Sequence, residues 1–199
     1  TNQIFRLFGL AGTGKTSCAR TIADELAVNS KFGAFAGKAA LQLQKAGCHG
    51  ASTIHSMIYK PVVDQETGIV DYEKVARYYH EDTQMFIIDE CSMVGDDIGE
   101  DLLSFGKPIL VLGDPGQLPP VKGSGFFVND KPDFMLTEIH RQAKDNPIIR
   151  LAHAVRNGEM ISPGTYGDSV VLPKGAKASK QDFMDYDMTL CGRNSTRQD

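Results

Sequence analysis

Short apolar runs alternate with an amphipathic pattern along much of the chain. IFRLFGL (4–10), FGAFAG (32–37), MFIIDE (85–90) and PILVLGD (108–114) are apolar runs of strand length, and TSCARTIADELAV (16–28) has apolar residues at three- and four-residue spacing. Apolar strands that alternate with helices are typical of a parallel sheet covered by helices on both faces. The pattern therefore predicts an α/β fold.

This alternation breaks between about Tyr59 and Gln84. The segment PVVDQETGIVDYE (61–73) has two short extended pieces around a glycine-containing turn. Such a segment is typical of a β-hairpin, so we expect a small hairpin insert within residues 60–84.

The composition fits one globular core and excludes several classes of protein. The chain has 199 residues, 41% hydrophobic and 23% charged. No apolar run approaches the ~20 residues that cross a bilayer, and no signal-peptide pattern is present. The four cysteines, Cys18, Cys48, Cys91 and Cys191, lack metal-ligand spacing and suit reduced thiols. We therefore expect a cytoplasmic protein without a membrane partner.

The formal net charge of −4 argues at first against a nucleic-acid partner. However, residues 81–101 hold eight of the 25 acidic residues and no Lys or Arg. The remainder carries 21 basic and 17 acidic residues, so the acidity is local and the objection is weak. Acids at a helix start explain Asp96, Asp97 and Glu100, whereas Asp89 and Glu90 need another explanation.

The segment GLAGTGKT, Gly9 to Thr16, fits GxxxxGK[ST] and lies between a predicted strand and a predicted helix. Gly12 and Gly14 allow a tight turn in which successive N–H groups point at phosphate oxygens. Lys15 is placed to reach the β- and γ-phosphates, and the Thr16 hydroxyl to bind Mg²⁺. The predicted nucleotide-binding residues are Gly9, Ala11, Gly12, Thr13, Gly14, Lys15, Thr16 and Ser17.

Two carboxylates end the apolar strand in FIIDECS. Ligands bind at the carboxyl ends of strands in open α/β sheets. Asp89 is therefore predicted to hold Mg²⁺, usually through water, and Glu90 to orient or deprotonate the attacking water.

The segment GDPGQLPPV (113–121) follows another apolar strand and places Gln117 at the same sheet edge. A neutral amide there can accept a hydrogen bond from the attacking water and donate one to the γ-phosphate. Gln117 is thus a candidate catalytic residue. A plain surface turn is the alternative.

With these motifs, the chain resembles the first motor lobe of a superfamily 1B DNA helicase of the RecD type. GLAGTGKT corresponds to that family's motif I, DECSMV to motif II and GDPGQLPPV to motif III. The weaker matches are FAGKAA (35–40) for motif Ia, STIHSM (52–57) for Ib and LTEIHRQ (136–142) for IV. The resemblance covers roughly Gln3 to Gly158, and LCGRNSTR (190–197) is similar to the strand that enters the second lobe.

The resemblance implies a RecA-like P-loop NTPase that uses ATP and Mg²⁺ to move along single-stranded DNA, 5′-to-3′ in this family. Arg141 corresponds to the motif IV arginine that stabilises charge at the γ-phosphate. Lys38, Thr53 and His55 fall on the family's DNA path. The hairpin corresponds to the small 1B element, in which Tyr72 is a candidate for stacking on a base. The resemblance is compatible with replication or recombination proteins as partners, but it does not identify a particular one.

The same resemblance suggests a domain division. Residues 1–160 correspond to motor lobe 1A, and residues 161–199 to a connector and the start of the second lobe. Motifs V and VI are not found in the sequence, and only three residues precede the first predicted strand. We therefore expect a fragment of a longer helicase.

Two other classes of function stay open at the level of sequence. One is an ATP-binding regulatory module without hydrolysis, which Glu90 and Gln117 oppose. The other is a P-loop kinase, which gives no role to the pairing of DEC with GDPGQLPP.

Overall fold

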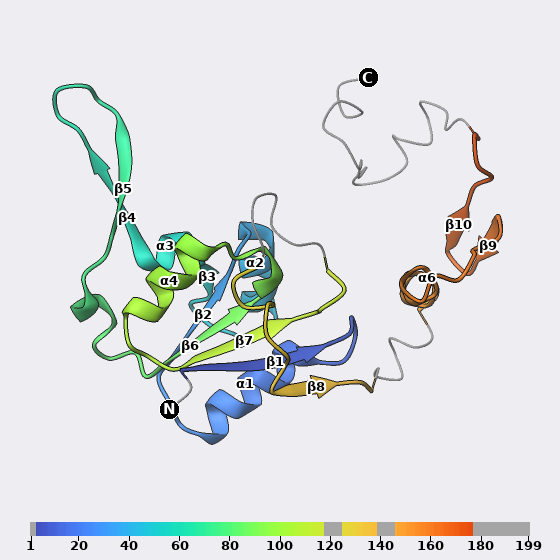
Figure 1. Ribbon diagram of the computed structural model, residues 1–199, viewed down its shortest axis with the longest axis horizontal. Helices are drawn as coiled ribbons and strands as arrows, with labels where there is room; N and C mark the ends of the chain where they lie inside the picture. The colour runs from blue at the N-terminus through green and yellow to red at the C-terminus, as the bar shows by residue number, and fades with distance from the viewer. Residues whose placement is uncertain (1–2, 118–124, 139–145, 177–199) are drawn as a thin grey trace. The chain divides into compact units, whose positions relative to one another are not determined.

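The computed structural model describes residues 3–117, 125–138 and 146–176 (Figure 1). The strands are β1 (Ile4–Gly9), β2 (Ser30–Ala34), β3 (Ser52–Thr53), β4 (Tyr59–Val63), β5 (Val70–Lys74), β6 (Met85–Asp89), β7 (Ile109–Gly113), β8 (Phe134–Leu136), β9 (Gly164–Tyr166) and β10 (Ser169–Val171). The helices are α1 (Lys15–Glu25), α2 (Gly37–Lys45), α3 (Ile54–Ile58), α4 (Asp96–Ser104) and α6 (Pro147–Arg156), with 3₁₀ turns η1 (Arg77–His80) and η2 (Cys91–Met93).

The chain divides into two compact units, Thr1–Ile149 and Arg150–Asp199. The second unit contains the antiparallel pair β9 and β10, joined through Gly167, which has a φ of 60°. None of the helices in the described ranges is long and apolar enough to span a membrane.

A six-stranded sheet organises the first unit. Its strand order is β3-β2-β6-β7-β1-β8, and every pairing in it is parallel. The carboxyl ends of β6, β7 and β1, which are adjacent, therefore lie at one edge. The loops that carry the three strongest sequence motifs begin at this edge.

Both faces of the sheet are buried under helices (Figure 1). Successive side chains of a strand point to opposite faces, so each central strand contributes to two cores. One core packs against α3 and α4 and includes Phe8, Phe86, Ile88, Ile109, Val111, Ile54, Ile58 and Leu102. The other packs against α1 and α2 and includes Leu7, Ile87, Leu110, Leu112, Ala19, Ala23, Ala40 and Leu43. The predicted α/β fold with two covered faces is confirmed.

The second strand does not lie where the apolar run places it. It spans Ser30–Ala34 instead of residues 32–37, because Ser30 and Lys31 pair with Met85 and Phe86 of β6. Strand pairing thus recruits two polar residues, while Ala36 already caps α2.

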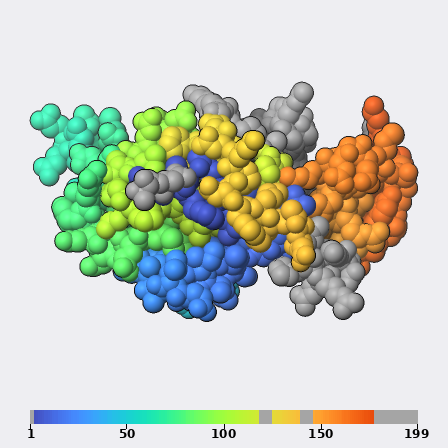
Figure 2. Space-filling view, turned by 60° about the horizontal axis from the view of Figure 1, so that its bottom comes forward, coloured from blue at the N-terminus to red at the C-terminus, as the bar shows by residue number. Residues whose placement is uncertain are grey.

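The predicted hairpin insert is confirmed. Strands β4 and β5 pair antiparallel, from Tyr59 opposite Lys74 at the root to Val63 opposite Val70 near the tip. At the tip, the Asp64 carboxylate accepts hydrogen bonds from the N–H groups of Glu66 (2.8 Å) and Thr67 (2.9 Å). The hairpin projects from the rest of its unit (Figures 1 and 2).

Candidate nucleotide site

The loop between β1 and α1 has the shape of a phosphate-binding loop. Gly12 (φ 79°) and Gly14 (φ 77°) adopt left-handed backbone conformations that favour glycine. Gly9 is also constrained, because a Cβ atom there would lie 2.5 Å from Thr13 Oγ1 and 2.9 Å from Leu136 Cβ. The loop therefore depends on glycine at all three positions.

Thr13 and Lys15 hold the loop from inside. The Thr13 side chain is buried, and its hydroxyl donates to the Leu10 carbonyl at 2.8 Å. Lys15 Nζ donates to the carbonyl oxygens of Gly9 (2.8 Å) and Leu10 (3.1 Å). Lys15 is the first residue of α1, and its ammonium group folds back onto the loop that precedes this helix.

The residues predicted to bind Mg²⁺ are brought together. The Thr16 hydroxyl, in the first turn of α1, donates to Asp89 Oδ2 at 2.9 Å, although the residues are 73 positions apart in sequence. A hydroxyl and a carboxylate are the oxygen ligands that Mg²⁺ takes beside phosphate oxygens. The donor set therefore fits this ion.

Glu90 follows Asp89 in an unusual backbone conformation. Its φ is 54° and its ψ is 43°, a left-handed conformation that is uncommon for residues other than glycine. The Glu90 N–H donates to Asp89 Oδ1 at 2.8 Å, so Asp89 is held from both sides. Such backbone strain persists where the surroundings enforce it, often at functional sites. The Glu90 side chain is half-buried.

Cys91, the residue after Glu90, is buried. Burial, followed by the neighbouring carboxylates of Asp89 and Glu90, raises the pKa of the Cys91 thiol to about 12. A raised pKa favours the protonated thiol at neutral pH. No cluster of three or more His, Cys, Asp or Glu side chains suited to a metal ion occurs among the described residues.

The loop after β7 is shaped by Asp114, which is buried. Its Oδ1 accepts from the Gly116 N–H at 2.9 Å, and its carbonyl oxygen accepts from the Gln117 N–H at 3.0 Å. This turn directs Gln117 back toward η2, where Ser92 Oγ donates to Gln117 Oε1 at 3.1 Å. Gln117 thus lies next to the Asp89–Glu90 segment, as its position after a neighbouring strand predicts.

The predicted DNA-contacting residues follow β2 and β3 at the same sheet edge. Lys38 lies exposed in the first turn of α2. Thr53 caps α3, its hydroxyl oxygen accepting from the Ser56 N–H at 3.1 Å. The His55 ring packs against Tyr59 (4.8 Å between centroids) and edge-on against Tyr72 (4.5 Å), so it joins α3 to the hairpin. Their role in binding DNA stays a prediction.

Several predicted features lie outside the described residues. These are Arg141 with most of LTEIHRQ, the segment 118–121 of GDPGQLPPV, and LCGRNSTR.

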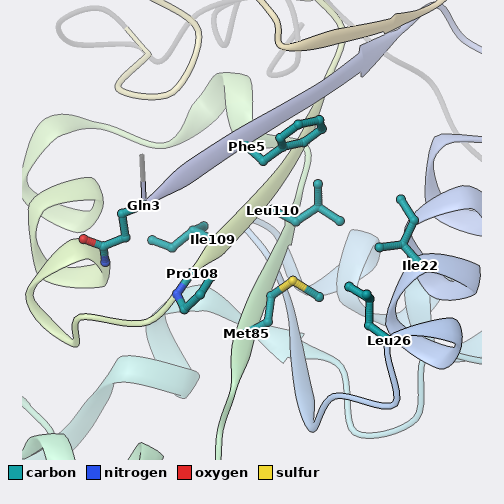
Figure 3. A pocket seen from close by; sticks show the side chains of 8 residues that line it. All are labelled: Gln3, Phe5, Ile22, Leu26, Met85, Pro108, Ile109 and Leu110. Atoms are coloured by element: carbon teal, nitrogen blue, oxygen red, sulfur yellow. The ribbon is translucent and has the colours of Figure 1, made fainter. Parts of the chain in front are cut away.

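A hollow of about 310 Å³ lies at the opposite, amino-terminal edge of the sheet (Figure 3). Its lining is apolar apart from Gln3 and consists of Gln3, Phe5, Ile22, Leu26, Met85, Pro108, Ile109 and Leu110. It lies at the starts of β1, β6 and β7, whereas the motif loops follow the ends of these strands. The candidate nucleotide site is therefore elsewhere.

A glycine-rich loop between a strand and a helix, with a hydroxyl and a carboxylate meeting at its base, defines a P-loop nucleotide-binding domain of the RecA-like kind. Residues 1–169 match the AAA domain family, and the chain belongs to that family. The family implies nucleotide binding.

The chain is similar to DNA helicases. It is 34% identical over 169 residues to the ATP-dependent RecD2 DNA helicase of Deinococcus radiodurans, covering 79% of this chain and 22% of that protein. The predicted resemblance to RecD-type helicases is confirmed.

Solved Pif1 helicases have a similar structure. One is described in a study of DNA unwinding at forked double-stranded DNA (26% identity, 79% of this chain and 45% of that chain, TM-score 0.57). Another is Pif1 from Bacteroides in complex with ADP-AlF3 and single-stranded DNA (26% identity, 80% and 43%, TM-score 0.56). The chain thus spans less than half the length of these relatives.

The structure adds residues to which the sequence alone assigns no role. Ser92 and Asp114 shape the loop that carries Gln117. Their sequence signal is their position, Ser92 two residues after Glu90 and Asp114 immediately after the last strand residue. Polar residues that directly follow apolar strands in a P-loop protein are the pattern that could identify them.

Proposed function

We propose that the first unit of the chain forms the ATP-hydrolysing lobe of a DNA helicase that moves along single-stranded DNA in the 5′-to-3′ direction. The observation that carries the proposal is the convergence of the Thr16–Asp89 and Ser92–Gln117 pairs at the ends of adjacent strands. A phosphate loop, a carboxylate pair and a glutamine are together the parts that position and activate water against a γ-phosphate.

The site residues have distinct roles in this proposal. The loop N–H groups and Lys15 bind the phosphates of ATP. Mg²⁺ held by Thr16 and Asp89 would neutralise charge on the phosphates. Glu90 accepts a proton from the attacking water, and Gln117 hydrogen-bonds this water or the γ-phosphate. Glu90 and Gln117 would have no purpose in a module that only binds ATP.

Single-stranded DNA is the proposed partner of the same sheet edge. Lys38 and Thr53 begin helices that follow β2 and β3, so a strand of DNA lying over this edge would meet both. Contacts to phosphates fix position without reading sequence, which suits a motor that moves along any DNA. The Bacteroides Pif1 complex with single-stranded DNA supports this class of partner.

A second motor lobe completes the proposed site. Arg141 would approach the γ-phosphate as a charge-stabilising finger, and residues 161–199 would lead into the second lobe, with 1–160 as the first. The free thiols of Cys18, Cys48 and Cys91 support a reducing compartment such as the cytoplasm.

The test is strand displacement by a protein that joins residues 1–199 to a second motor lobe. Duplexes with a single-stranded tail at either the 5′ or the 3′ end are supplied with ATP and Mg²⁺. We expect displacement of the 5′-tailed duplex, none with Lys15→Ala, and full activity with the matched control Lys45→Ala on the exposed end of α2. Displacement of only the 3′-tailed duplex would contradict the proposed polarity. Displacement of neither, by a folded protein, would contradict the helicase proposal.

A further inference from the structure

The candidate catalytic amide is held by a buried hydroxyl. Ser92 is only 3% exposed, and its Oγ donates to Gln117 Oε1 at 3.1 Å. The two residues come from different loops, Ser92 from η2 after β6 and Gln117 from the loop after β7. A buried hydroxyl with one fixed partner is a stronger constraint than an exposed one.

This hydrogen bond determines which end of the amide faces outward. A glutamine side chain accepts through Oε1 and donates through its NH₂ group. Because Ser92 engages the oxygen, the Nε2 donors of Gln117 remain available for a phosphate oxygen or for water.

The backbone of the same loop is fixed separately. Asp114 accepts from the N–H groups of Gly116 and Gln117. Gly113 packs so closely on η2 that a Cβ atom there would lie 2.8 Å from Cys91 Sγ. The carboxyl end of β7, where this loop begins, thus packs directly on the segment that carries Glu90, and Ser92 is the side chain that links this segment to Gln117.

We propose that Ser92 is a positioning residue for ATP hydrolysis, which holds the Gln117 amide with its NH₂ group toward the γ-phosphate. The inference rests on the proposed function, because it assumes that Gln117 acts on the reacting phosphate. Glu90 and Ser92 flank Cys91 in one segment, so the same segment sets the geometry of both the general base and the amide.

The kinetic test is a double-mutant cycle on DNA-stimulated hydrolysis by the two-lobe protein. We expect Ser92→Ala to lower kcat about 3- to 10-fold with KM unchanged, the range for one neutral hydrogen bond felt in the transition state. In a Gln117→Ala background, Ser92→Ala should change kcat by less than about twofold. Independent effects that multiply in the double variant would overturn the proposal.

Two further variants separate the hydrogen bond from packing. Ser92→Cys keeps the volume but has a weak donor, so kcat should fall as in Ser92→Ala. Ser92→Thr keeps the hydroxyl and should retain most of the activity. The matched control is Ser30→Ala, at the amino-terminal end of β2, which should leave kcat unchanged. Full activity of Ser92→Cys would overturn the proposal.

The contact itself can be tested on residues 1–199 without any activity. In a ¹⁵N spectrum, the side-chain amide signals of Gln117 are those that vanish in Gln117→Ala. Ser92→Ala should shift these signals and Ser30→Ala should not. Unshifted signals in Ser92→Ala would contradict the positioning role even in an active enzyme. Conversely, a shift in residues 1–199 combined with no DNA-stimulated hydrolysis by the two-lobe protein would support the contact and count against the proposed function alone.

Discussion

At the scale of single residues, the phosphate loop satisfies its own polar groups. Lys15 donates to two carbonyl oxygens of the loop, and Thr13 donates to one of them. These bonds are partly buried, but neither Thr13 nor Lys15 belongs to the two apolar cores. The Lys15 side chain is therefore expected to matter for phosphate and little for the fold.

In residues 1–199 joined to a second motor lobe, Lys15→Ala is expected to abolish nucleotide hydrolysis while the protein stays folded. Removing one charged donor from a developing phosphate charge costs about 10² in rate or more. The measurement is phosphate release together with urea unfolding, with Lys45→Ala as the control for loss of one lysine. A large drop in the unfolding midpoint would instead assign Lys15 a structural role.

Gly113→Ala is expected to destabilise the protein by about 1 to 3 kcal/mol through overpacking. A Cβ atom at this position would lie 2.8 Å from Cys91 Sγ and 3.1 Å from the Phe8 ring. The control is Gly95→Ala, because nothing lies within 4 Å of a Cβ atom there. Urea unfolding of both variants checks the difference, and equal midpoints would show that the carboxyl end of β7 is not packed against η2.

The residue scale also shows where prediction from sequence ends. The sequence places three site residues together, because each lies at or after the carboxyl end of an apolar strand in a parallel sheet. These residues are Thr16, Asp89 and Gln117. The orientation of the Gln117 amide cannot be predicted from the sequence. It depends on a hydrogen bond from Ser92, which is 25 residues away in sequence and lies in another loop.

At the scale of elements, one carboxylate of α4 binds both strands of the hairpin. Asp101 Oδ2 accepts from the Tyr59 hydroxyl at 2.5 Å, and Asp101 Oδ1 accepts from Lys74 Nζ at 2.6 Å. Tyr59 and Lys74 are the paired root residues of β4 and β5. Both strands of the hairpin are thus held at one point, and α4 itself begins soon after the Asp89–Glu90 segment.

The ionisation of this cluster gives a pH dependence. Burial works to raise the pKa of Asp101, but the hydrogen bonds from Lys74 and Tyr59 outweigh it and lower the pKa below its usual value. The contribution of Asp101 to stability is therefore fully present above the pKa that this carboxyl has in the unfolded chain. It is lost as the pH falls through the lower pKa of the folded state.

Asp101→Asn is accordingly expected to lower the free energy of unfolding by about 1 to 2 kcal/mol at pH 7. The difference from the unsubstituted chain should shrink as the pH is lowered through the folded-state pKa of Asp101. Urea unfolding at a series of pH values measures it. Glu73→Gln is the control in the same hairpin, since the exposed Lys60–Glu73 pair is 3.9 Å apart and contributes little. A pH-independent difference would contradict the role assigned to Asp101.

Elements were predictable where apolar runs alone decide them. The centres of β6 and β7 are buried on both faces and read as continuous apolar segments, and β1 follows this pattern apart from Arg6 and the exposed Phe5. The bounds of β2 could not be predicted in this way, because Ser30 and Lys31 are polar and join the sheet through pairing with β6. The attachment of the hairpin through Asp101 was not predictable either, because it joins residues distant in sequence.

At the scale of the whole molecule, the candidate site has one wall within the first unit. In the proposed function ATP lies between this unit and a second motor lobe, so water would reach the site in residues 1–199 alone. Electrostatic stabilisation of the reacting phosphate is weaker where water is not excluded.

Residues 1–199 on their own are therefore expected to bind ATP or ADP with Mg²⁺ weakly, to hydrolyse little, and not to unwind duplex DNA. Any affinity for single-stranded DNA should be weak, because few phosphate contacts would carry it, and it should fall as the salt concentration rises, because those contacts are electrostatic. Lys38→Ala should weaken this binding and reduce its salt dependence, as measured by fluorescence anisotropy at several salt concentrations. Binding that is insensitive to salt would contradict a phosphate-contacting surface.

The most direct test of the whole account is phosphate release from ATP by residues 1–199 joined to a second motor lobe, measured with and without single-stranded DNA. We expect DNA to stimulate release strongly, Lys15→Ala to abolish the stimulated rate and Lys45→Ala to retain it. A rate that does not respond to single-stranded DNA, in a folded protein that binds ATP, would contradict this expectation.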